Sequence, residues 1–283
     1  MRPDPFAYHQ PRSLTEASSL VAELGDCATF YAGGTELLLL MKMQLAEYSH
    51  LVNLKKIDGL KKIDMEDDRL IVGALATHHD IASNATVSEH CPSLSRLCGE
   101  IANIRVRVAG TIGGNLCFAE PRADPPVLLV ALDAGLRLVS AHASRVIPAC
   151  EFFLGPFETA RKPDEILTTI EIPLGTGTAS VERMKQGNYS LATAAISRRD
   201  CHQTWIGYGG GAPKRLDGTG ALLDRDNGRT SEEALFAAVA EDIADLEIPS
   251  DIEAGESYRR HLIAVAVKRA LVSLHETEAT GVN

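Results

Sequence analysis

The chain has 283 residues, with 38 acidic and 28 basic side chains and a formal net charge of −10. This charge argues against nucleic acid as a partner, because binding a phosphate backbone needs clustered lysine and arginine. Hydrophobic residues make up 45% of the sequence, which argues against disorder and allows a substantial core in one large domain or two modest ones.

The first half of the chain alternates short apolar stretches with amphipathic ones. A capping box at Ser13–Glu16 predicts a helix that ends at Gly25. Apolar runs bounded by polar turns predict strands, and longer periodic runs predict helices. The expected strands are 29–32, 51–54 and 70–73, the last two on either side of a polar turn, and the expected helices are 37–41 and about 79–102.

The second half begins with Asp124, which can cap a helix that has Pro125 at its first position and runs to Leu132. Past Pro173 the stretch 174–178 is typical of a linker. Strands followed by helices then indicate a small α+β domain. The elements expected here are strands 135–139, 181–184, 192–197 and 204–208, a helix opening at Thr230 with Glu233 three residues on, and a last helix at about 257–275.

Two double-glycine motifs carry the strongest functional signal. Ala32-Gly33-Gly34-Thr35 lies between an expected strand and an expected helix, and Thr111-Ile112-Gly113-Gly114-Asn115 follows some eighty residues later. One glycine pair is more often an ordinary turn. Two pairs in matching contexts indicate loops whose backbone N–H groups bind one diphosphate beside helix N-termini. Neither motif has the Gly-Lys-Ser/Thr ending of a P-loop or the G-x-G-x-x-G spacing of a Rossmann fold, which disfavours both.

Other classes of site find little support. The six cysteines have no C-x-x-C spacing, so an iron–sulfur cluster or zinc site within the chain is not expected. His78 and His79 are adjacent, and their side chains diverge rather than forming a helical metal pair. The absence of Gly-x-Ser-x-Gly disfavours a hydrolase. Without an apolar signal-peptide core or an apolar run of about 18 to 20 residues, we expect a cytoplasmic protein with no membrane span.

The glycine motifs belong to longer matches. The first, with Leu37, Leu38, Met41 and Lys42, resembles the A-G-G-T-x-L-L-x-x-M-K signature of the FAD-binding medium subunits of molybdenum hydroxylases, the xanthine dehydrogenase and carbon monoxide dehydrogenase family. The second resembles that family's I-R-N-x-G-T-I-G-G-N stretch. The resemblance then continues along nearly the whole chain, through Pro121, Ala123-Asp124, Pro126, Ala131-Leu132-Asp133-Ala134, 165–173, Lys185-Gln186, 206–210 and Tyr258-Arg259-Arg260.

The resemblance implies an α+β fold in two domains. A two-lobed PCMH-type FAD-binding domain would cover 1–174, with lobes at about 1–55 and 56–174, and a smaller α+β domain would cover 175–283. Three residues depart from the family pattern beside the flavin loop and put the local shape around the ring in doubt. These are Val108, where asparagine is usual, Phe118, where a small residue is usual, and Glu120.

The resemblance also implies which residues bind FAD. Asp124 would accept hydrogen bonds from the ribose, or act only as a helix cap; Leu167 would contact FAD, or be core alone. Lys185 would lie near the flavin pyrimidine, or be a surface lysine, and Tyr189 would cover the ring or cap a strand edge. The full expected set is Tyr31, Ala32, Gly33, Gly34, Thr35, Glu36, Leu37, Ile101, Thr111, Gly113, Gly114, Asn115, Asp124, Leu167, Lys185 and Tyr189.

The family's electron path implies the partners. In such complexes a large subunit holds molybdopterin, a small subunit holds two [2Fe–2S] clusters, and FAD in the medium subunit passes electrons to an external acceptor. We therefore expect an oxidoreductase subunit without catalytic residues of its own, in a dimer of heterotrimers. A self-sufficient FAD oxidoreductase of the same fold and a non-catalytic nucleotide-binding protein stay open as alternatives. The organic substrate and the acceptor (NAD, a quinone, a cytochrome or oxygen) are not expected to be readable from this chain.

Overall fold

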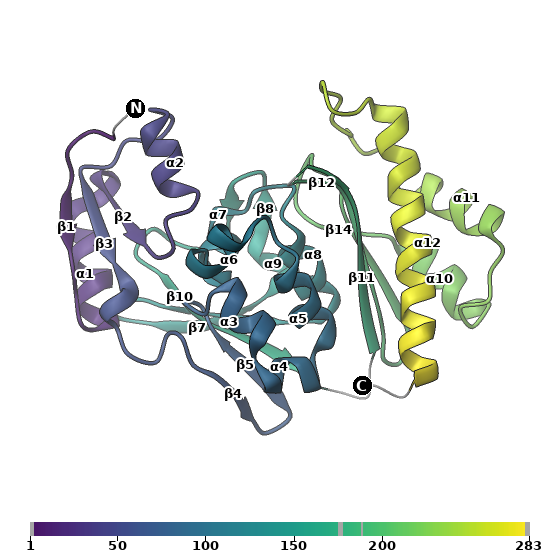
Figure 1. The fold of residues 1–283 in the computed structure, drawn as a ribbon, viewed down its shortest axis with the longest axis horizontal. Coiled ribbons are helices and arrows are strands. Elements are labelled where there is room, and N and C mark those ends of the chain that lie inside the picture. The colour runs from purple at the N-terminus through teal and green to yellow at the C-terminus, as the bar shows by residue number, and fades with distance from the viewer. Residues whose placement is uncertain (1–2, 175–177, 188, 281–283) are drawn as a thin grey trace.

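The computed structural model describes residues 3–174, 178–187 and 189–280. Figure 1 shows three parts side by side, each built around its own sheet. We call them the N-terminal lobe (3–56), the middle lobe (57–174) and the C-terminal domain (178–280). The mixture of helices and strands confirms the α+β fold class, whereas the domain boundaries stay a prediction.

The N-terminal lobe contains a parallel sheet in the order β1-β3-β2. Ser13 caps its first helix by accepting a hydrogen bond from Glu16 N at 3.1 Å, and Gly25 ends that helix with φ 59°, as the sequence predicts. The elements are β1 (Ala7–His9), α1 (Leu14–Leu24), β2 (Ala28–Tyr31), α2 (Leu37–Lys42), β3 (His50–Asn53) and the 3₁₀ turns η1 (Gly25–Cys27) and η2 (Leu54–Lys56).

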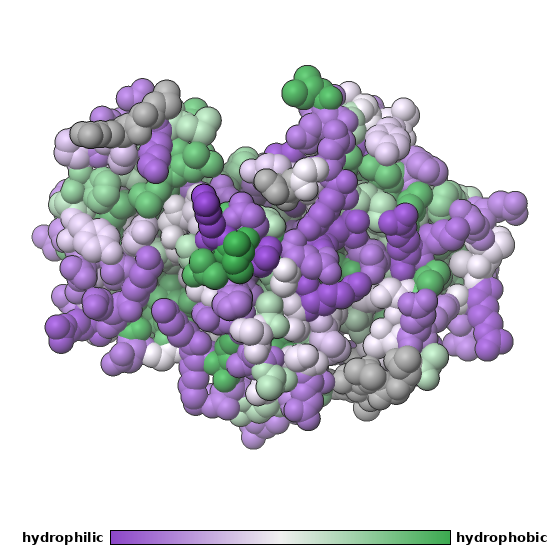
Figure 2. Space-filling model, viewed as in Figure 1, coloured by the Kyte–Doolittle hydropathy of each residue, from purple (hydrophilic) through white to green (hydrophobic). Residues whose placement is uncertain are grey.

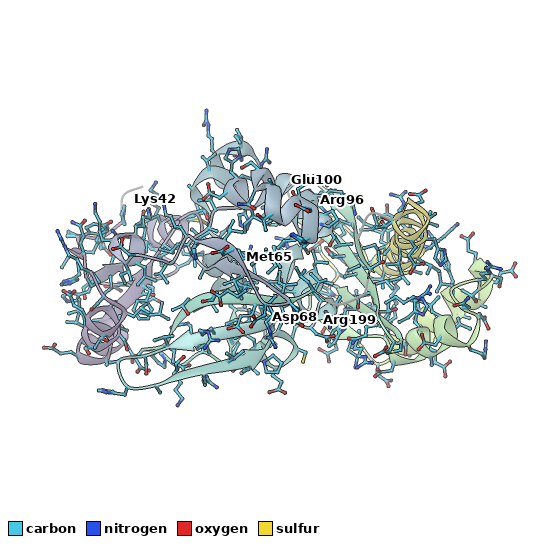
Figure 3. All side chains as sticks on the ribbon, turned by 90° about the horizontal axis from the view of Figure 1, so that it is seen from below. Lys42, Met65, Asp68, Arg96, Glu100 and Arg199 are labelled. Atoms are coloured by element: carbon cyan, nitrogen blue, oxygen red, sulfur yellow. The ribbon has the colours of Figure 1, made fainter. Side chains whose placement is uncertain are left out.

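The middle lobe contains an antiparallel sheet in the order β4-β5-β10-β6-β7. In Figure 3 the end of α5, marked by Arg96 and Glu100, lies above this sheet. The strands are β4 (Ile63–Glu66), β5 (Arg69–Gly73), β6 (Gly135–Val139), β7 (Ser144–Pro148), β8 (Phe153–Gly155), β9 (Glu158–Thr159) and β10 (Ile166–Pro173). The helices are α3 (His78–Ser83), α4 (Ala85–His90), α5 (Pro92–Gly99), α6 (Ile104–Ala109), α7 (Ile112–Phe118), α8 (Asp124–Ala131) and α9 (Ala149–Phe152).

The C-terminal domain contains an antiparallel sheet in the order β11-β12-β13-β14. The long helix α12 packs on β11 and β12, while α8 of the middle lobe contacts β12 and β13. The elements are β11 (Thr178–Gln186), β12 (Tyr189–Arg198), β13 (His202–Gly207), β14 (Lys214–Arg215), α10 (Asp217–Arg225), α11 (Glu232–Asp242) and α12 (Glu256–Thr280).

The cores of the three parts are joined. The apolar cluster of the N-terminal lobe includes Leu75 and Ile166 from the middle lobe, and the cluster of the middle lobe includes Val181 and Ala195 from the C-terminal domain. All four side chains are less than 5% exposed. Because apolar burial is the dominant favourable term in folding, these shared contacts hold the parts in a fixed arrangement.

The prediction of a single helix over about 79–102 is wrong. The segment forms three helices, because two residues interrupt it. Asn84 leaves the helical region with ψ 125° and caps α4 by accepting from Val87 N at 3.0 Å. Cys91, at φ −147°, stands before Pro92, which clashes with a helical residue ahead of it and so starts α5 anew.

Other expectations fail at their boundaries. Strands 51–54 and 70–73 belong to different sheets, and the short, partly charged strand β4 lies between them. The helix expected to open at Thr230 is capped instead by Ser231, whose Oγ accepts from Ala234 N at 3.2 Å. Helix α10 was not expected. The predicted linker 174–178 falls largely outside the described residues. No helix in the described ranges has the length and apolarity needed to cross a membrane.

Candidate functional site

A cavity of about 490 Å³ lies between the N-terminal lobe and the middle lobe. Its walls come from the segment after β2, from α2, from the stretch between α5 and α8, and from the start of β12. Figure 2 shows the molecule hollowed between the N-terminal lobe and the remainder. Tyr31 and Lys185 lie outside this lining, whereas the other predicted site residues line it together: Ala32, Gly33, Gly34, Thr35, Glu36, Leu37, Ile101, Thr111, Gly113, Gly114, Asn115, Asp124, Leu167 and Tyr189.

The first glycine loop presents free backbone donors to the cavity. Gly34 has φ 74°, which turns the chain sharply before α2 begins at Leu37. Within the described part of the chain, the backbone N–H groups from Gly33 to Leu37 donate to no protein acceptor. Successive free amides in a turn form a concave anion-binding nest. The geometry of this loop is therefore suited to an anion.

The first glycine loop touches the backbone of Ala109 and Gly110, directly before the second glycine motif. A Cβ built on Gly33 would overlap the carbonyl oxygen of Ala109 and lie 2.9 Å from Gly110 Cα. A Cβ on Gly110 would lie 3.4 Å from Thr35 Oγ1, so Thr35 of the first loop also lies against Gly110. Glycine is thus required at position 33 for the close approach of two chain segments, both of which line the cavity.

The backbone amides at the second glycine pair are not free, contrary to the prediction. It lies in the first turn of α7, where Thr111 Oγ1 caps the helix by accepting from Gly114 N at 3.1 Å. The amides of Ile112 and Gly113 donate to Ala76 O at 3.0 Å and Ala74 O at 2.8 Å. The expectation of free amide donors is therefore wrong for these three residues. Gly113 instead lets α7 pack against Ala74, whose Cβ a side chain would meet at 2.6 Å.

Asn115 follows this pair and has an unused polar atom. Its Oδ1 is buried and has no hydrogen-bond partner among the described residues, although the residue lines the cavity. A buried polar atom without a partner costs about 1 to 3 kcal/mol. Such an atom beside a cavity indicates a place where a bound molecule completes the hydrogen bonding.

Asp124 is a buried acceptor rather than a helix cap. It is the first residue of α8, Ala123 is the N-cap, and Pro125 therefore occupies the second helical position, not the first. Its carboxylate accepts from Thr193 Oγ1 at 2.5 Å and from Arg183 Nη1 at 3.4 Å. The alternative of a capping role alone is wrong, because the side chain bonds across to β11 and β12.

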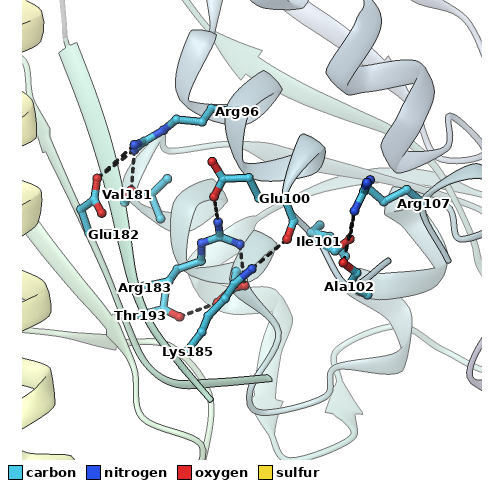
Figure 4. A network of polar contacts seen from close by, with 11 residues as sticks. Arg96, Glu100, Ile101, Ala102, Arg107, Val181, Glu182, Arg183, Lys185 and Thr193 are labelled. Carbon is cyan, nitrogen blue, oxygen red and sulfur yellow. Dashed lines mark hydrogen bonds and ion pairs between the residues drawn. The ribbon is translucent and has the colours of Figure 1, made fainter. Parts of the chain in front are cut away.

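A polar network ties β11 to the end of α5 (Figure 4). Arg183 also pairs with Glu100, and Lys185 Nζ donates to the Glu100 carbonyl oxygen at 2.7 Å. Arg96 donates to Glu182 and to the Val181 carbonyl oxygen. Burial, and next the neighbouring Arg183, lower the pKa of Lys185. The network therefore places the β11–β12 hairpin beside the cavity and orients Lys185 toward α5 instead of into the lining.

The start of β12 forms another part of the rim. Tyr189 is 42% exposed, and the Arg122 guanidinium lies 4.1 Å from the centre of its ring. Arg122 in turn pairs with Glu120 and with Glu253 of the C-terminal domain. Glu120, one of the departures from the family pattern, thus helps to hold the arginine that covers Tyr189. Burial raises the pKa of Glu120, and also that of Glu36.

The other two departures have separate surroundings. Phe118 lines the cavity and meets Phe157 edge to face, with ring centroids 5.2 Å apart. Val108 is 51% exposed on α6 and lies outside the lining. Tyr31, also outside the lining, packs its ring beneath Gly34 and receives Lys55 Nζ at 4.5 Å from the ring centre.

Several lining residues were missed by the sequence reasoning. His78, Phe157, Arg161 and Glu165 line the cavity, and of these only Glu165 lies in a stretch that carries the family resemblance. Glu165 is 5% exposed and receives Arg145 at 2.8 and 2.9 Å, and this hydrogen-bonded guanidinium lowers the pKa of Glu165. No local sequence signal marked His78, Phe157 or Arg161 as part of a site. Over the described ranges, no group of three or more histidine, cysteine or acidic residues is arranged to hold a metal.

Comparisons with known proteins agree with the geometry. Residues 4–175 match the family model described as the FAD binding domain in molybdopterin dehydrogenase. The carbon monoxide dehydrogenase medium chain of Hydrogenophaga pseudoflava is 33% identical over 282 residues, 96% of this chain and 97% of that protein. The glyceraldehyde dehydrogenase medium chain of Sulfolobus acidocaldarius is 30% identical over 280 residues, 95% of this chain and 98% of that one.

The fold comparison gives the same result. A solved structure of carbon monoxide dehydrogenase from Hydrogenophaga pseudoflava, lacking the Mo-pyranopterin moiety of the molybdenum cofactor, matches with a TM-score of 0.91 at 30% identity. The match covers 98% of this chain and 99% of the chain in that structure. The resemblance inferred from the glycine motifs is thus confirmed.

The hydrogen bond between Thr193 and Asp124 allows a matched stability test. Thr193→Val should lower the free energy of unfolding by about 1 to 3 kcal/mol, because it leaves a buried carboxylate oxygen without this donor. The control is Thr204→Val, which removes a fully buried hydroxyl that lacks a partner among the described residues and should be neutral or stabilising. Urea unfolding of both variants measures the difference, and equal losses would contradict the role given to Thr193.

The Arg145–Glu165 pair predicts a pH effect. Arg145→Met should lower the free energy of unfolding at pH 7 by about 1 kcal/mol, a value that allows for solvent screening of the partly exposed arginine. Because the folded pKa of Glu165 is depressed, this stabilisation is present above the unfolded pKa of about 4.3 and is lost as pH falls through the folded value. The difference between wild type and variant should therefore shrink from pH 7 to about pH 3.5. A constant difference, or an unchanged pH dependence in Glu165→Gln, would oppose this account.

Proposed function

Because this chain belongs to the FAD-binding medium subunits of molybdenum hydroxylases, we propose that it binds one FAD and relays electrons from partner iron–sulfur clusters to an external acceptor. The observation that supports this proposal is the cavity that the first loop, with its free amides, lines together with the second glycine motif. We infer that this cavity takes a ligand whose phosphate lies at the junction of the two lobes. When bound, FAD supplies a flavin ring that takes up electrons singly and releases them in pairs.

The residues of the cavity fit FAD. The amides from Gly33 to Leu37 would hold the diphosphate. Asp124 would accept hydrogen bonds from ribose hydroxyls while Thr193 and Arg183 keep its carboxylate in place. Asn115 Oδ1 would gain the partner that it lacks among the described residues.

The placement of the isoalloxazine ring is supported by fewer contacts than that of the diphosphate. Ile101, Leu167 and Tyr189 line the cavity and supply apolar and aromatic surface on which a planar ring packs. Arg122 holds the Tyr189 ring at the rim, where the ring can exclude water. A role for Lys185 rests on the family resemblance, since its ammonium group donates to Glu100 in this structure.

The partners are proposed from the relatives. Two of them are named medium chains, one of a carbon monoxide dehydrogenase and one of a glyceraldehyde dehydrogenase. We therefore propose a large molybdopterin subunit and a small subunit with two [2Fe–2S] clusters as separate chains, assembled as a dimer of heterotrimers in the cytoplasm. This chain would contribute the flavin site and perform no hydroxylation itself.

A carboxylate substitution tests the cofactor site. Asp124→Ala should weaken FAD binding by about 1.5 to 3 kcal/mol, the range for a hydrogen bond to a charged group. Titration of FAD into the flavin-free chain, followed by flavin fluorescence, measures the effect. The matched control is Asp242→Ala, which removes a carboxylate that also accepts from a threonine, Thr219 Oγ1 at 2.7 Å, but lies outside the cavity. The same dissociation constant in both variants would exclude Asp124 from the site.

The relay role is tested by reconstitution. The chain alone should carry FAD that dithionite reduces, yet remain unreactive toward organic substrates of the assembled enzyme. Once the two partner subunits are added, substrate should bleach the flavin absorbance in a stopped-flow experiment. If the chain alone turned over an organic substrate as fast as the assembly, it would be a self-sufficient flavoenzyme. A purified chain that binds nucleotides but no flavin would support the non-catalytic alternative.

A further inference from the structure

His78 is a buried histidine beside Gly110, where the first glycine loop contacts the segment before the second glycine motif. It is the first residue of α3, it is 2% exposed, and it lines the cavity. Its backbone N donates to Gly110 O at 3.1 Å, and a Cβ on Gly110 would lie 3.4 Å from the His78 ring. Since Gly110 also contacts Gly33, the imidazole lies next to the loop that presents the free amides.

The ring has a defined polar pattern. Nδ1 is fully buried and without a hydrogen-bond partner among the described residues, so a proton there would be an unsatisfied buried donor. A neutral ring with its proton on Nε2 leaves Nδ1 as the unpartnered atom and places the N–H donor on the other nitrogen of a residue that lines the cavity. Burial, and next the nearby Arg107, lower the pKa of His78 to about 4, so the ring is neutral at physiological pH.

We propose that His78 is a cofactor-binding residue whose Nε2–H donates to an oxygen of the FAD diphosphate. The first loop supplies amides on one side of the phosphate, and the imidazole supplies a donor from the opposite lobe. The contact does not require a charged ring, because the neutral imidazole protonated on Nε2 already has this donor. This inference rests on the proposed FAD site and assigns it a residue that none of the sequence motifs includes.

The neighbouring histidine provides the control. His79 follows in the same helix but is exposed and lies outside the cavity lining. His78→Ala should weaken FAD binding about ten- to a hundredfold, the range for a hydrogen bond to a charged group, whereas His79→Ala should leave it unchanged. His78→Gln, which keeps a side-chain N–H donor, should recover part of the loss.

ADP is the second probe, because it has the diphosphate and lacks the flavin. His78→Ala should weaken ADP binding by the same factor as FAD binding. A loss confined to FAD would overturn the assignment to the diphosphate, and unchanged binding of both would overturn the inference altogether. Failure of the wild-type chain to bind FAD would instead overturn the proposed function.

A spectroscopic measurement keeps the inference testable if the variants fold poorly. In the wild-type chain labelled with ¹⁵N-histidine, the His78 signals should show the neutral form protonated on Nε2. Adding ADP should shift the Nε2 signal while Nδ1 keeps the shift of an unprotonated nitrogen. A His78 Nε2 resonance that does not respond to saturating ADP would contradict the proposed contact. Melting temperatures of the ligand-free variants identify purely structural effects, since these would lower stability without changing affinity.

Discussion

The backbone contact between the first glycine loop and the segment directly before the second glycine motif is the constraint on which the site depends. Gly33 lies so close to Ala109 and Gly110 that no side chain fits between them. This contact joins the N-terminal lobe to the middle lobe and leaves the amides after Gly33 facing a common cavity. Shared apolar clusters then fix the two lobes, since Leu75 and Ile166 of the middle lobe are buried in the core of the N-terminal lobe.

The C-terminal domain completes the site from the other side. Thr193 and Arg183 reach across to Asp124, and Tyr189 forms part of the rim under Arg122. Without these contacts the Asp124 carboxylate would be a buried charge with too few partners, which is costly in a low-dielectric interior. The second domain therefore acts on the cavity through hydrogen bonds to one acidic residue and through one aromatic ring.

The sequence located the two glycine motifs correctly, but it did not show which of their amides are free. The Ala32–Thr35 loop forms the expected strand-to-helix turn, because a positive φ at Gly34 and the flanking apolar runs are local features. The second glycine pair was expected to offer amides, but Ala74 and Ala76 accept two of them. Those carbonyl acceptors belong to another segment of the chain. Contacts between distant segments cannot be read from the order of residues around a motif. For the same reason the sequence did not distinguish His78 from its exposed neighbour His79. It also did not show that Thr193 and Arg183 are the partners of Asp124.

The central claim is that the amides from Gly33 to Leu37 hold the diphosphate, while those of Ile112, Gly113 and Gly114 are already bonded within the protein. Amide hydrogen exchange, measured with and without FAD, tests this most directly. The account predicts strong new protection from Gly33 to Leu37 on FAD binding and little change from Ile112 to Gly114. Bound FAD with unchanged exchange from Gly33 to Leu37 would contradict it.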